Sequence, residues 1–170
     1  MTNQAPTALI IGATGGIGSE MALALQARGW RIRALNRAPA KAAKANANLG
    51  TIEWVKGDAL RPADVLAAAQ GVSLVFHGAN PPGYKNWAGT ALPMLESSIA
   101  AAKAVGARLV FPGTVYNFGP DTFPLISETS PQNPQTRKGA IRVAMEQRLA
   151  DVSREGVKVL IVRAGDFFGG

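Results

Sequence analysis

Near the start of the chain, a glycine-rich turn, GATGGIG at residues 12–18, follows the apolar run Thr7–Ile11. An amphipathic stretch comes directly after the turn, and strand, glycine turn and helix in this order are typical of parallel α/β folds. Glycine adopts positive φ angles without a steric clash, and a bare backbone lets phosphate groups reach the N–H groups at a helix start. We therefore expect a dinucleotide to bind at Gly12, Thr14, Gly15, Gly16, Ile17 and Gly18.

The length of 170 residues fits one domain, because domains usually hold roughly 100–200 residues. No apolar run reaches the ~18 residues that span a bilayer, and the polar segment Met1–Pro6 does not resemble a secretory signal. The chain has no cysteine, so a disulfide framework is excluded. We expect a single domain over residues 1–170, a cytoplasmic location and no membrane partner.

The formal net charge is +7, but the cations are scattered and no aromatic residues are interleaved among them, unlike a nucleic-acid surface. Solvated helix surfaces are the simplest explanation, an anionic phosphate ligand comes next and a nucleic acid third. We therefore expect a small-molecule ligand and no nucleic-acid partner. The single histidine, His77, gives no support for a metal cluster. Whether the chain forms a homodimer is left open.

Short segments rich in Val, Ile and Leu alternate with helical segments that end near glycines, and this alternation predicts a parallel sheet. We expect an α/β Rossmann-type, doubly wound sheet of about six strands in the order 3-2-1-4-5-6, with strands buried on both faces. The predicted strands are Thr7–Gly12, Arg31–Asn36, Thr51–Lys56, Ser73–His77, Arg108–Pro112 and Val157–Arg163. The predicted helices are Gly16–Arg28, Pro39–Leu49, Pro62–Gln70, Trp87–Val105 and Thr136–Glu155.

Two stretches fall outside this alternation. Asn117–Gln135 is a long loop with four prolines, and loops of this length are often functional. The last strand runs into RAGDFFGG and the chain stops at Gly170. Because ligands of open α/β folds bind beyond the carboxyl ends of the strands, we expect that a substrate-binding portion is missing.

Arg37 and its neighbour Asn36 follow the second strand, where an acidic residue usually binds the ribose 2′-hydroxyl of NAD. A carboxylate would repel a 2′-phosphate, whereas a guanidinium binds it with two hydrogen bonds. Such a charge-assisted bond contributes about 1.5–3 kcal/mol. We therefore expect NADP(H) to be preferred over NAD(H). The alternative is a solvated arginine at a strand end.

Other strand ends carry candidate cofactor contacts. Asp58, followed by Ala59, comes after the third strand, where its carboxylate has two open interpretations: it accepts a hydrogen bond from adenine, or it caps the next helix. His77 ends the fourth strand, and Gly78 and Ala79 let a cofactor approach the backbone. For His77 itself, packing that pre-organises this loop is the favoured role.

The segment after the fifth strand, RLVFPGTVYNFG, is the candidate reaction centre. Thr114 offers a hydroxyl at the strand end, and Tyr116 offers a phenol two residues later. Both residues have ordinary structural interpretations, since a hydroxyl is common in turns and a half-buried aromatic ring is common at a domain surface.

In the last helix, Ile141, Met145, Leu149 and Val152 recur at helical spacing and predict the buried face. Lys138 and Arg142 fall within the same stripe, although like charges four residues apart are mildly destabilising. One interpretation directs both cations at a bound cofactor. The other pairs Arg142 with Glu146, which lies one turn further along the helix.

Together these motifs resemble the extended branch of the short-chain dehydrogenase/reductase superfamily, the NAD-dependent epimerase/dehydratase family. GATGGIG matches the GxxGxxG loop of that branch, and KGDAL, VFHGAN, LVFPGTVYNFGP and VRAGDFFG match its successive strand ends. The resemblance covers essentially the whole chain. It implies a Rossmann domain that binds a nicotinamide dinucleotide.

In that family, a Ser or Thr after the fifth strand and a Tyr-x-x-x-Lys motif on the next helix carry catalysis. The resemblance places the Ser/Thr position at Thr114, the Tyr position at Lys138 and the Lys position at Arg142, so this chain reads KGAIR. Arg142 is then expected to bind the nicotinamide ribose, while the tyrosine that exchanges a proton is absent. Two functions follow as expectations. One is an NADP(H)-dependent oxidoreductase or epimerase acting on a carbonyl, hydroxyl or sugar-nucleotide substrate with Thr114, Tyr116, Lys138 and Arg142 as its catalytic residues. The other is a non-catalytic NADP(H)-binding redox sensor or regulatory module.

Overall fold

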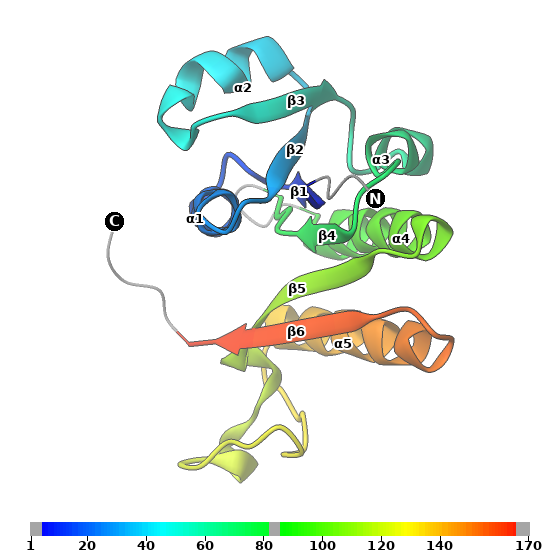
Figure 1. The fold of residues 1–170 in the computed structure, drawn as a ribbon. Coiled ribbons are helices and arrows are strands. Elements are labelled where there is room, and N and C mark those ends of the chain that lie inside the picture. The colour runs from blue at the N-terminus through cyan, green and yellow to red at the C-terminus, as the bar shows by residue number, and fades with distance from the viewer. Residues whose placement is uncertain (1–4, 82–85, 166–170) are drawn as a thin grey trace.

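Six parallel strands form one sheet in the order β3-β2-β1-β4-β5-β6, which confirms the predicted topology (Figure 1). The structure is a computed structural model that describes residues 5–81 and 86–165; the end of the VRAGDFFG motif, from Asp166 on, lies outside the described residues. The strands are β1 (Thr7–Ile11), β2 (Arg31–Asn36), β3 (Ile52–Lys56), β4 (Leu74–His77), β5 (Arg108–Thr114) and β6 (Val159–Ala164).

The predicted helices are present, with ends that differ by a few residues. They are α1 (Gly16–Gln26), α2 (Pro39–Ala45), α3 (Pro62–Ala68), α4 (Trp87–Val105) and α5 (Arg137–Arg154), with short 3-10 turns η1 (Ala47–Leu49), η3 (Val115–Asn117) and η4 (Pro120–Thr122). Positive φ angles occur at all the glycines expected to end helices, namely Gly29, Gly50, Gly71, Gly106 and Gly156. Thr136 caps α5, because its hydroxyl oxygen accepts a hydrogen bond from the N–H of Gly139.

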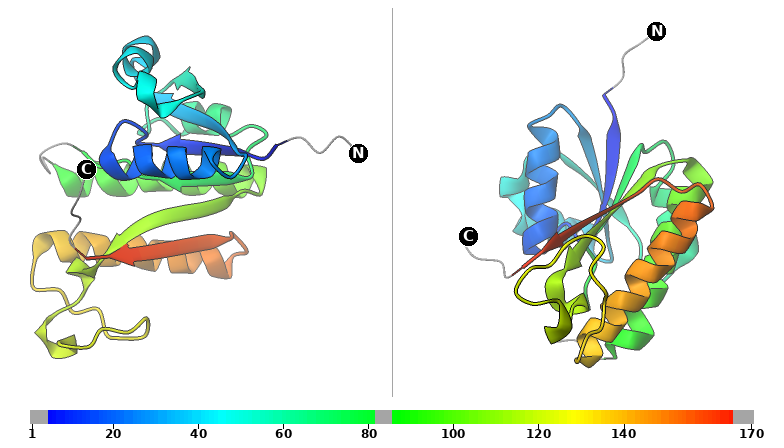
Figure 2. Two further views of the ribbon diagram at one scale, coloured as in Figure 1. Left: turned by 60° about the vertical axis from the view of Figure 1, so that its left-hand side comes forward. Right: turned by 90° about the horizontal axis from the view of Figure 1, so that it is seen from below.

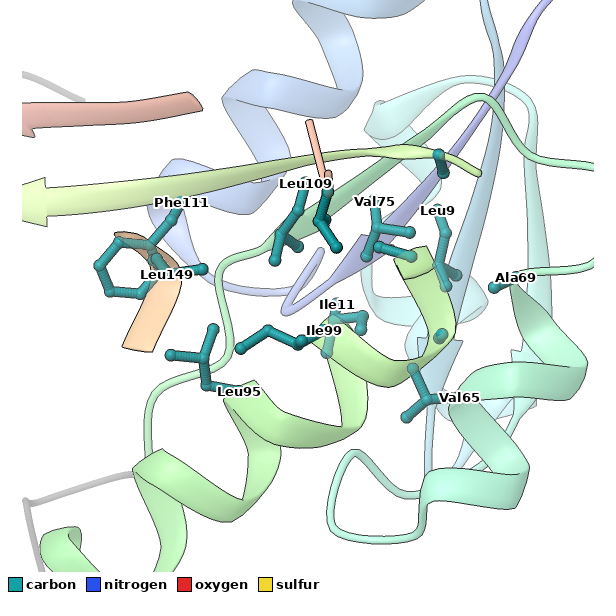
Figure 3. Close-up of a cluster of buried hydrophobic side chains, with 14 of the residues drawn as sticks. Leu9, Ile11, Val65, Ala69, Val75, Leu95, Ile99, Leu109, Phe111 and Leu149 are labelled. Carbon is teal, nitrogen blue, oxygen red and sulfur yellow. The ribbon is translucent and has the colours of Figure 1, made fainter. Parts of the chain in front are cut away.

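Helices cover both faces of the sheet, with α1 and α2 on one side and α3, α4 and α5 on the other (Figure 2). The larger core cluster lies on the α3–α5 side, where side chains of β1, β4 and β5 pack against those helices (Figure 3). Leu9, Val75 and Leu109, one from each of these strands, are fully buried there. This core fixes the carboxyl ends of the central strands, from which the candidate site is built.

The edge strand β6 departs from the expectation that every strand is buried on both faces. Val159 and Ile161 pack against the larger core cluster, whereas Leu160 is 46% exposed and Val162 is 53% exposed. The same expectation is wrong for β3, the other edge strand, because its residues are only partly buried. Side chains alternate between the two faces of a strand, and no described helix packs on the outer face of β6.

The connection from β5 to α5 is more ordered than the predicted long loop. Strand β5 runs two residues further than expected, because Gly113 and Thr114 pair with Arg163 and Ala164 of β6. The following residues form the turns η3 and η4 before the chain reaches α5. In Figure 1 this connection projects beyond the β6 edge of the sheet. As a result, Thr114 is held within the sheet and not in a loop.

Candidate functional site

The glycine turn brings the β1–α1 connection against the end of β4. Gly12 has a φ angle of 97°, and a Cβ there would lie 2.6 Å from the carbonyl carbon of Gly78. A Cβ at Gly18 would collide with the backbone oxygen of Gly12. Gly15 occupies the N-cap of α1 without a side-chain hydrogen bond. The first N–H groups of α1 are thus not occupied by a side-chain cap, as an anion site at a helix start requires.

A cavity of about 420 Å³, here the central cavity, opens between this turn and the ends of β2, β3 and β4. Most of the predicted cofactor contacts line it: Gly12, Thr14, Gly15, Asn36, Arg37, Asp58, Ala59, Gly78 and Ala79. Gly16 and Gly18 do not line it, and Gly18 serves the close packing of the turn. Ile17 lines a neighbouring cavity instead. The structure therefore brings together residues from four separate segments of the chain.

Three cations surround a second cavity of about 370 Å³, here the basic cavity, which shares Arg37, Gly57 and Asp58 with the central one. The three cations are Arg37, Lys56 and Arg61. Within residues 5–81 and 86–165, none of the three forms an ion pair. The basic cavity therefore offers a positive environment suited to an anion.

The two carboxylates of the basic cavity are already hydrogen-bonded to backbone N–H groups. Asp64 Oδ2 accepts from the N–H of Asp58 at 2.9 Å, and Asp58 Oδ1 accepts from the N–H of Leu60 at 2.9 Å. Arg61, not Asp58, is the N-cap residue of α3, so the helix-capping interpretation of Asp58 is wrong. Asn36 makes a similar turn, with its Oδ1 accepting from the N–H of Ala38 at 2.8 Å.

A third cavity of about 250 Å³, here the Thr114 cavity, lies at the ends of β4 and β5. It shares Gly78, Ala79 and Asn80 with the central cavity. Thr114 is 9% exposed, and its Oγ1 has no hydrogen-bond partner among the described residues. Tyr116 also lines this cavity and is 48% exposed. Both candidate residues of the predicted reaction centre therefore line the same cavity.

His77 lies beside the same cavity and is 1% exposed. Its Nδ1 is 2.7 Å from Oγ of Ser98 on α4, and its ring stacks on Phe111 with centroids 6.1 Å apart. Burial is the main cause that lowers the pKa of His77 to about 3, and the charge of Arg142 adds to the effect. The imidazole is consequently neutral at physiological pH.

Arg142 lines the Thr114 cavity with its guanidinium held in place by three groups. Nη1 donates to the carbonyl of Pro112 at 3.3 Å. The guanidinium carbon lies 5.1 Å from the ring centroid of Trp87 and 5.5 Å from that of Phe111. Such contacts hold a cation close to an apolar surface. The expected place of Arg142 near the reaction centre is consistent with this geometry.

Lys138 differs from its expected position. It is exposed, not part of the buried face of α5, and lines a separate cavity of about 750 Å³ between α4 and α5. Trp87 lines that α4–α5 cavity and stacks on Arg142, which lines the Thr114 cavity. The Trp87–Arg142 contact thus lies between the two cavities. The structure places Thr114, Tyr116 and Arg142 at one cavity and Lys138 at another.

The alternative interpretation of Arg142, in which it pairs with Glu146, is wrong. Glu146 is 4% exposed and its carboxylate binds Arg163 of β6, with the Nη2–Oε2 distance at 2.7 Å. Gln132 Nε2 donates to the same carboxylate at 3.1 Å, and Asn117 Nδ2 donates to Gln132 Oε1 at 3.0 Å. This network fastens both ends of the β5–α5 connection next to Thr114.

Several residues of the site were not predicted. Lys56 and Arg61 flank the Gly57–Asp58 pair, and these two positive charges near Asp58 could have predicted the basic cavity from the sequence. Asn80 lines both the central and the Thr114 cavities and accepts a hydrogen bond from the indole N–H of Trp87 at 2.7 Å. Ser98 contacts His77 from the middle of α4, and no sequence signal linked the two.

No helix within residues 5–81 and 86–165 combines the length and apolar character needed to cross a membrane. Among the same residues, no three His, Cys, Asp or Glu side chains are grouped so that they could bind a metal ion.

Solved structures with the same fold include sugar-nucleotide epimerases, and the chain spans about half the length of each. UDP-glucose 4-epimerase from Brucella ovis in complex with NAD has a TM-score of 0.80 and 21% identity, over 94% of this chain and 51% of that chain. UDP-glucuronic acid 4-epimerase from Bacillus cereus in complex with NAD has a TM-score of 0.79 and 19% identity, over 96% of this chain and 57% of that chain. The UDP-Glc/GlcNAc 4-epimerase from Campylobacter jejuni has a TM-score of 0.76 and 21% identity, over 93% of this chain and 53% of that chain. At these identities the likeness establishes the fold.

No protein of curated function matches the sequence. The sequence profile of the NAD dependent epimerase/dehydratase family, however, matches residues 8–170, which is nearly the whole chain. The match begins in β1, directly before the glycine turn, and includes every segment that lines the three strand-end cavities. The resemblance seen in the motifs is therefore confirmed. This chain belongs to the NAD dependent epimerase/dehydratase family.

Proposed function

We propose that this chain binds NADP(H) and supplies the cofactor-binding part of an oxidoreductase or epimerase that acts on a carbonyl, hydroxyl or sugar-nucleotide substrate. One observation carries the proposal: the basic, central and Thr114 cavities form a continuous series along the carboxyl ends of the strands, because each shares residues with the next. An elongated ligand with a phosphate group at one end fits such a series. Ligands of open α/β sheets bind at this edge.

The NADP preference rests on the basic cavity. Arg37, Lys56 and Arg61 surround it without ion pairs of their own in the described part of the chain. Both carboxylates there are engaged by backbone N–H groups. A 2′-phosphate would bring negative charge to a cavity whose three cations outnumber its two carboxylates. Charge-assisted hydrogen bonds to a phosphate are stronger than hydrogen bonds between neutral groups. Two solved epimerase structures with this fold are complexes with NAD, so the preference for a 2′-phosphate is specific to our proposal.

At the other end of the series, the chain's own groups would act on a substrate. The Thr114 hydroxyl would orient a substrate oxygen by a hydrogen bond. The phenol of Tyr116 would exchange a proton with that substrate oxygen. Arg142 would supply a fixed positive charge near the ribose, because a guanidinium does not lose its proton. A bound nicotinamide supplies hydride transfer. Lys138, which lines the α4–α5 cavity, would have no part in this step.

A second candidate function is a non-catalytic NADP(H)-binding sensor or regulatory module. The observation that favours it is the position of Lys138, because the residue at the family's tyrosine position is a lysine and lies outside the Thr114 cavity. In this case the cofactor would bind in the same cavities. The difference between the two functions is turnover.

Calorimetric titration of the purified chain with NADP+ and NAD+ tests the cofactor, and a panel of carbonyl compounds and UDP-sugars with NADPH tests the reaction. We expect NADP+ to bind at least about tenfold more tightly than NAD+. Equal affinities would refute the NADP preference, and no binding of either would refute the function. When the panel is assayed with the full-length protein, turnover of any member supports the enzyme, whereas tight binding with no turnover supports the sensor.

The cytoplasmic location stays a prediction, and we propose it in keeping with the lack of cysteine. The sequence left the formation of a homodimer open, and size-exclusion chromatography with light scattering measures the oligomeric state directly.

A further inference from the structure

Among the buried polar atoms beside the Thr114 cavity, Nε2 of His77 and Oγ1 of Thr114 lack hydrogen-bond partners in the described part of the chain. Their side chains are 1% and 9% exposed. Both residues line the same cavity. Buried polar groups in native proteins are nearly always hydrogen-bonded, so two such atoms beside one cavity point to a ligand that completes them.

The contact with Ser98 decides which nitrogen of His77 carries the proton. Ser98 Oγ donates to the backbone carbonyl of Met94 at 3.2 Å, in the i−4 pattern of helical serines. A hydroxyl has one hydrogen, so a Ser98 Oγ that donates to Met94 accepts from His77 Nδ1, 2.7 Å away. In this arrangement the proton lies on Nδ1, and Nε2 carries a lone pair.

Burial and the charge of Arg142 lower the pKa of His77 to about 3. The imidazole thus keeps its lone pair on Nε2 throughout the physiological pH range. Two other side chains of the cavity differ from it, because the Arg142 guanidinium only donates hydrogen bonds and the Thr114 hydroxyl both donates and accepts them. Among these three side chains, His77 is the one that can only accept at Nε2.

We propose that His77 Nε2 accepts a hydrogen bond from the nicotinamide half of the bound dinucleotide, and that Ser98 is the positioning residue that fixes its tautomer. This inference rests on the proposed function. The cavity lies at the end of the series opposite Arg37, Lys56 and Arg61, where the half without the 2′-phosphate would lie. That half offers donors of two kinds, the carboxamide N–H and the ribose hydroxyls.

His77 is the single histidine of the chain, so nuclear magnetic resonance of protein labelled with [15N]histidine reports on it without assignment. In the free protein, we expect a protonated Nδ1 and an unprotonated Nε2. Saturating NADP+ is expected to shift the Nε2 signal towards that of a hydrogen-bonded nitrogen, with little change at Nδ1. Adenosine 2′,5′-bisphosphate, which lacks the nicotinamide half, should leave Nε2 unchanged. Nicotinic acid adenine dinucleotide phosphate distinguishes the donors, because it retains the ribose hydroxyls and lacks the amide.

Two neighbouring serines on α4 provide a matched pair of variants. Ser98 and Ser97 are both buried, and each donates to the carbonyl four residues earlier. In Ser98→Ala, we expect the proton of His77 to be no longer fixed on Nδ1. NADP+ binding should weaken about threefold to tenfold, which is the effect of one neutral hydrogen bond. Affinity for adenosine 2′,5′-bisphosphate should not change. Ser97→Ala should leave the tautomer and both affinities unchanged.

Removing the acceptor itself gives an independent test. His77→Phe keeps an aromatic ring beside Phe111 and is expected to lower NADP+ affinity by the same factor as Ser98→Ala, again without effect on adenosine 2′,5′-bisphosphate. If NADP+ binds and the Nε2 signal does not move, the inference about His77 is refuted and the proposed function stands. If the folded protein binds neither NADP+ nor the bisphosphate, the proposed function itself fails. Equal losses in the two serine variants would refute the role of Ser98.

Discussion

Glu146 on α5 and Arg163 on β6 form a two-point ion pair, in which Arg163 Nη2 and Nε both donate to Glu146 Oε2, at 2.7 and 3.0 Å. The Glu146 side chain is 4% exposed and that of Arg163 is 25% exposed. The guanidinium also lies 5.5 Å from the ring centroid of Phe118. This pair and Gln132 join the last helix, the edge strand and the β5–α5 connection at one point.

Breaking this pair from one side should destabilise the fold strongly. Glu146→Leu leaves the Arg163 charge partly buried without its partner, and we expect the free energy of unfolding to fall by about 3 kcal/mol. The double variant with Arg163→Leu should recover much of this loss, because no charge remains unpaired. Urea unfolding followed by circular dichroism measures both. A single variant as stable as the parent would contradict the prediction.

The three cations of the basic cavity should set the cofactor preference. Replacing Arg37, Lys56 or Arg61 by alanine is expected to weaken NADP+ binding about tenfold each, the loss of one charge-assisted contact. NAD+ affinity should stay the same, because NAD+ lacks the 2′-phosphate. Lys44→Ala, on exposed α2 and outside the cavity, is the matched control for charge alone. Equal loss in the control would show a long-range charge effect in place of direct contacts.

Two glycines of the turn should respond differently to the same change. A Cβ at Gly18 meets backbone atoms of Gly12, whereas nothing lies within 4 Å of a Cβ at Gly16. We expect Gly18→Ala to destabilise the protein by about 1–3 kcal/mol through overpacking. Gly16→Ala, at the start of α1, should be neutral or stabilise by up to about 1 kcal/mol. Thermal unfolding of the two variants measures the difference, and similar melting temperatures would contradict this account of the turn.

The Thr114 hydroxyl should contribute nothing to stability. Because its Oγ1 is buried without a partner in the described part of the chain, Thr114→Val should keep or raise the free energy of unfolding, by up to about 1 kcal/mol. The matched control is Thr122→Val, since the buried Thr122 hydroxyl donates to the carbonyl of Gly119 at 2.8 Å and its removal should destabilise by about 1 kcal/mol. Urea unfolding compares them. A marked loss of stability in Thr114→Val would show a structural role for this hydroxyl.

Stability should depend on pH through His77. Its folded pKa is about 3, below the ordinary value of 6.5, so between these values the unfolded chain binds a proton that the folded chain does not. Stability therefore falls as the pH decreases through this window, by up to about 1.4 kcal/mol per pH unit. Since His77 is the single histidine, His77→Phe should remove this slope between about pH 6.5 and about pH 5. Unfolding curves at several pH values test this, and parallel pH profiles for the two proteins would contradict it.

Much of the fold could be predicted because its signals are local. The glycine turn, the short apolar strands and the glycines after helices each depend on a few neighbouring residues, and together they predicted the strand order of the sheet. The exposed outer face of β6 was not predictable in this way. Leu160 and Val162 have the composition of a buried strand, and whether a helix covers them depends on elements far away in the sequence.

The contacts of α5 show why the site was harder to predict than the fold. Helical spacing placed Lys138 on the buried stripe, but the stripe is covered only where the helix lies against the sheet, and Lys138 lies in its first turn. The spacing rule paired Arg142 with Glu146, whereas the carboxylate binds Arg163, seventeen residues further along the chain. Long-range partners of this kind have no signature in local periodicity.

The reversal of strand order at β1 has a consequence for how this protein can change. Residues before β4 build the basic cavity, and residues from β4 onward contribute most of the Thr114 cavity. The two ends of the series thus come from successive portions of the chain that meet at the glycine turn. Under the proposed function, we therefore expect that substitutions that alter the choice between phosphorylated and unphosphorylated dinucleotide can accumulate in one portion without disturbing the groups of the other. Cofactor selectivity and chemistry would then be separately adjustable, and either could be engineered while the other is held constant.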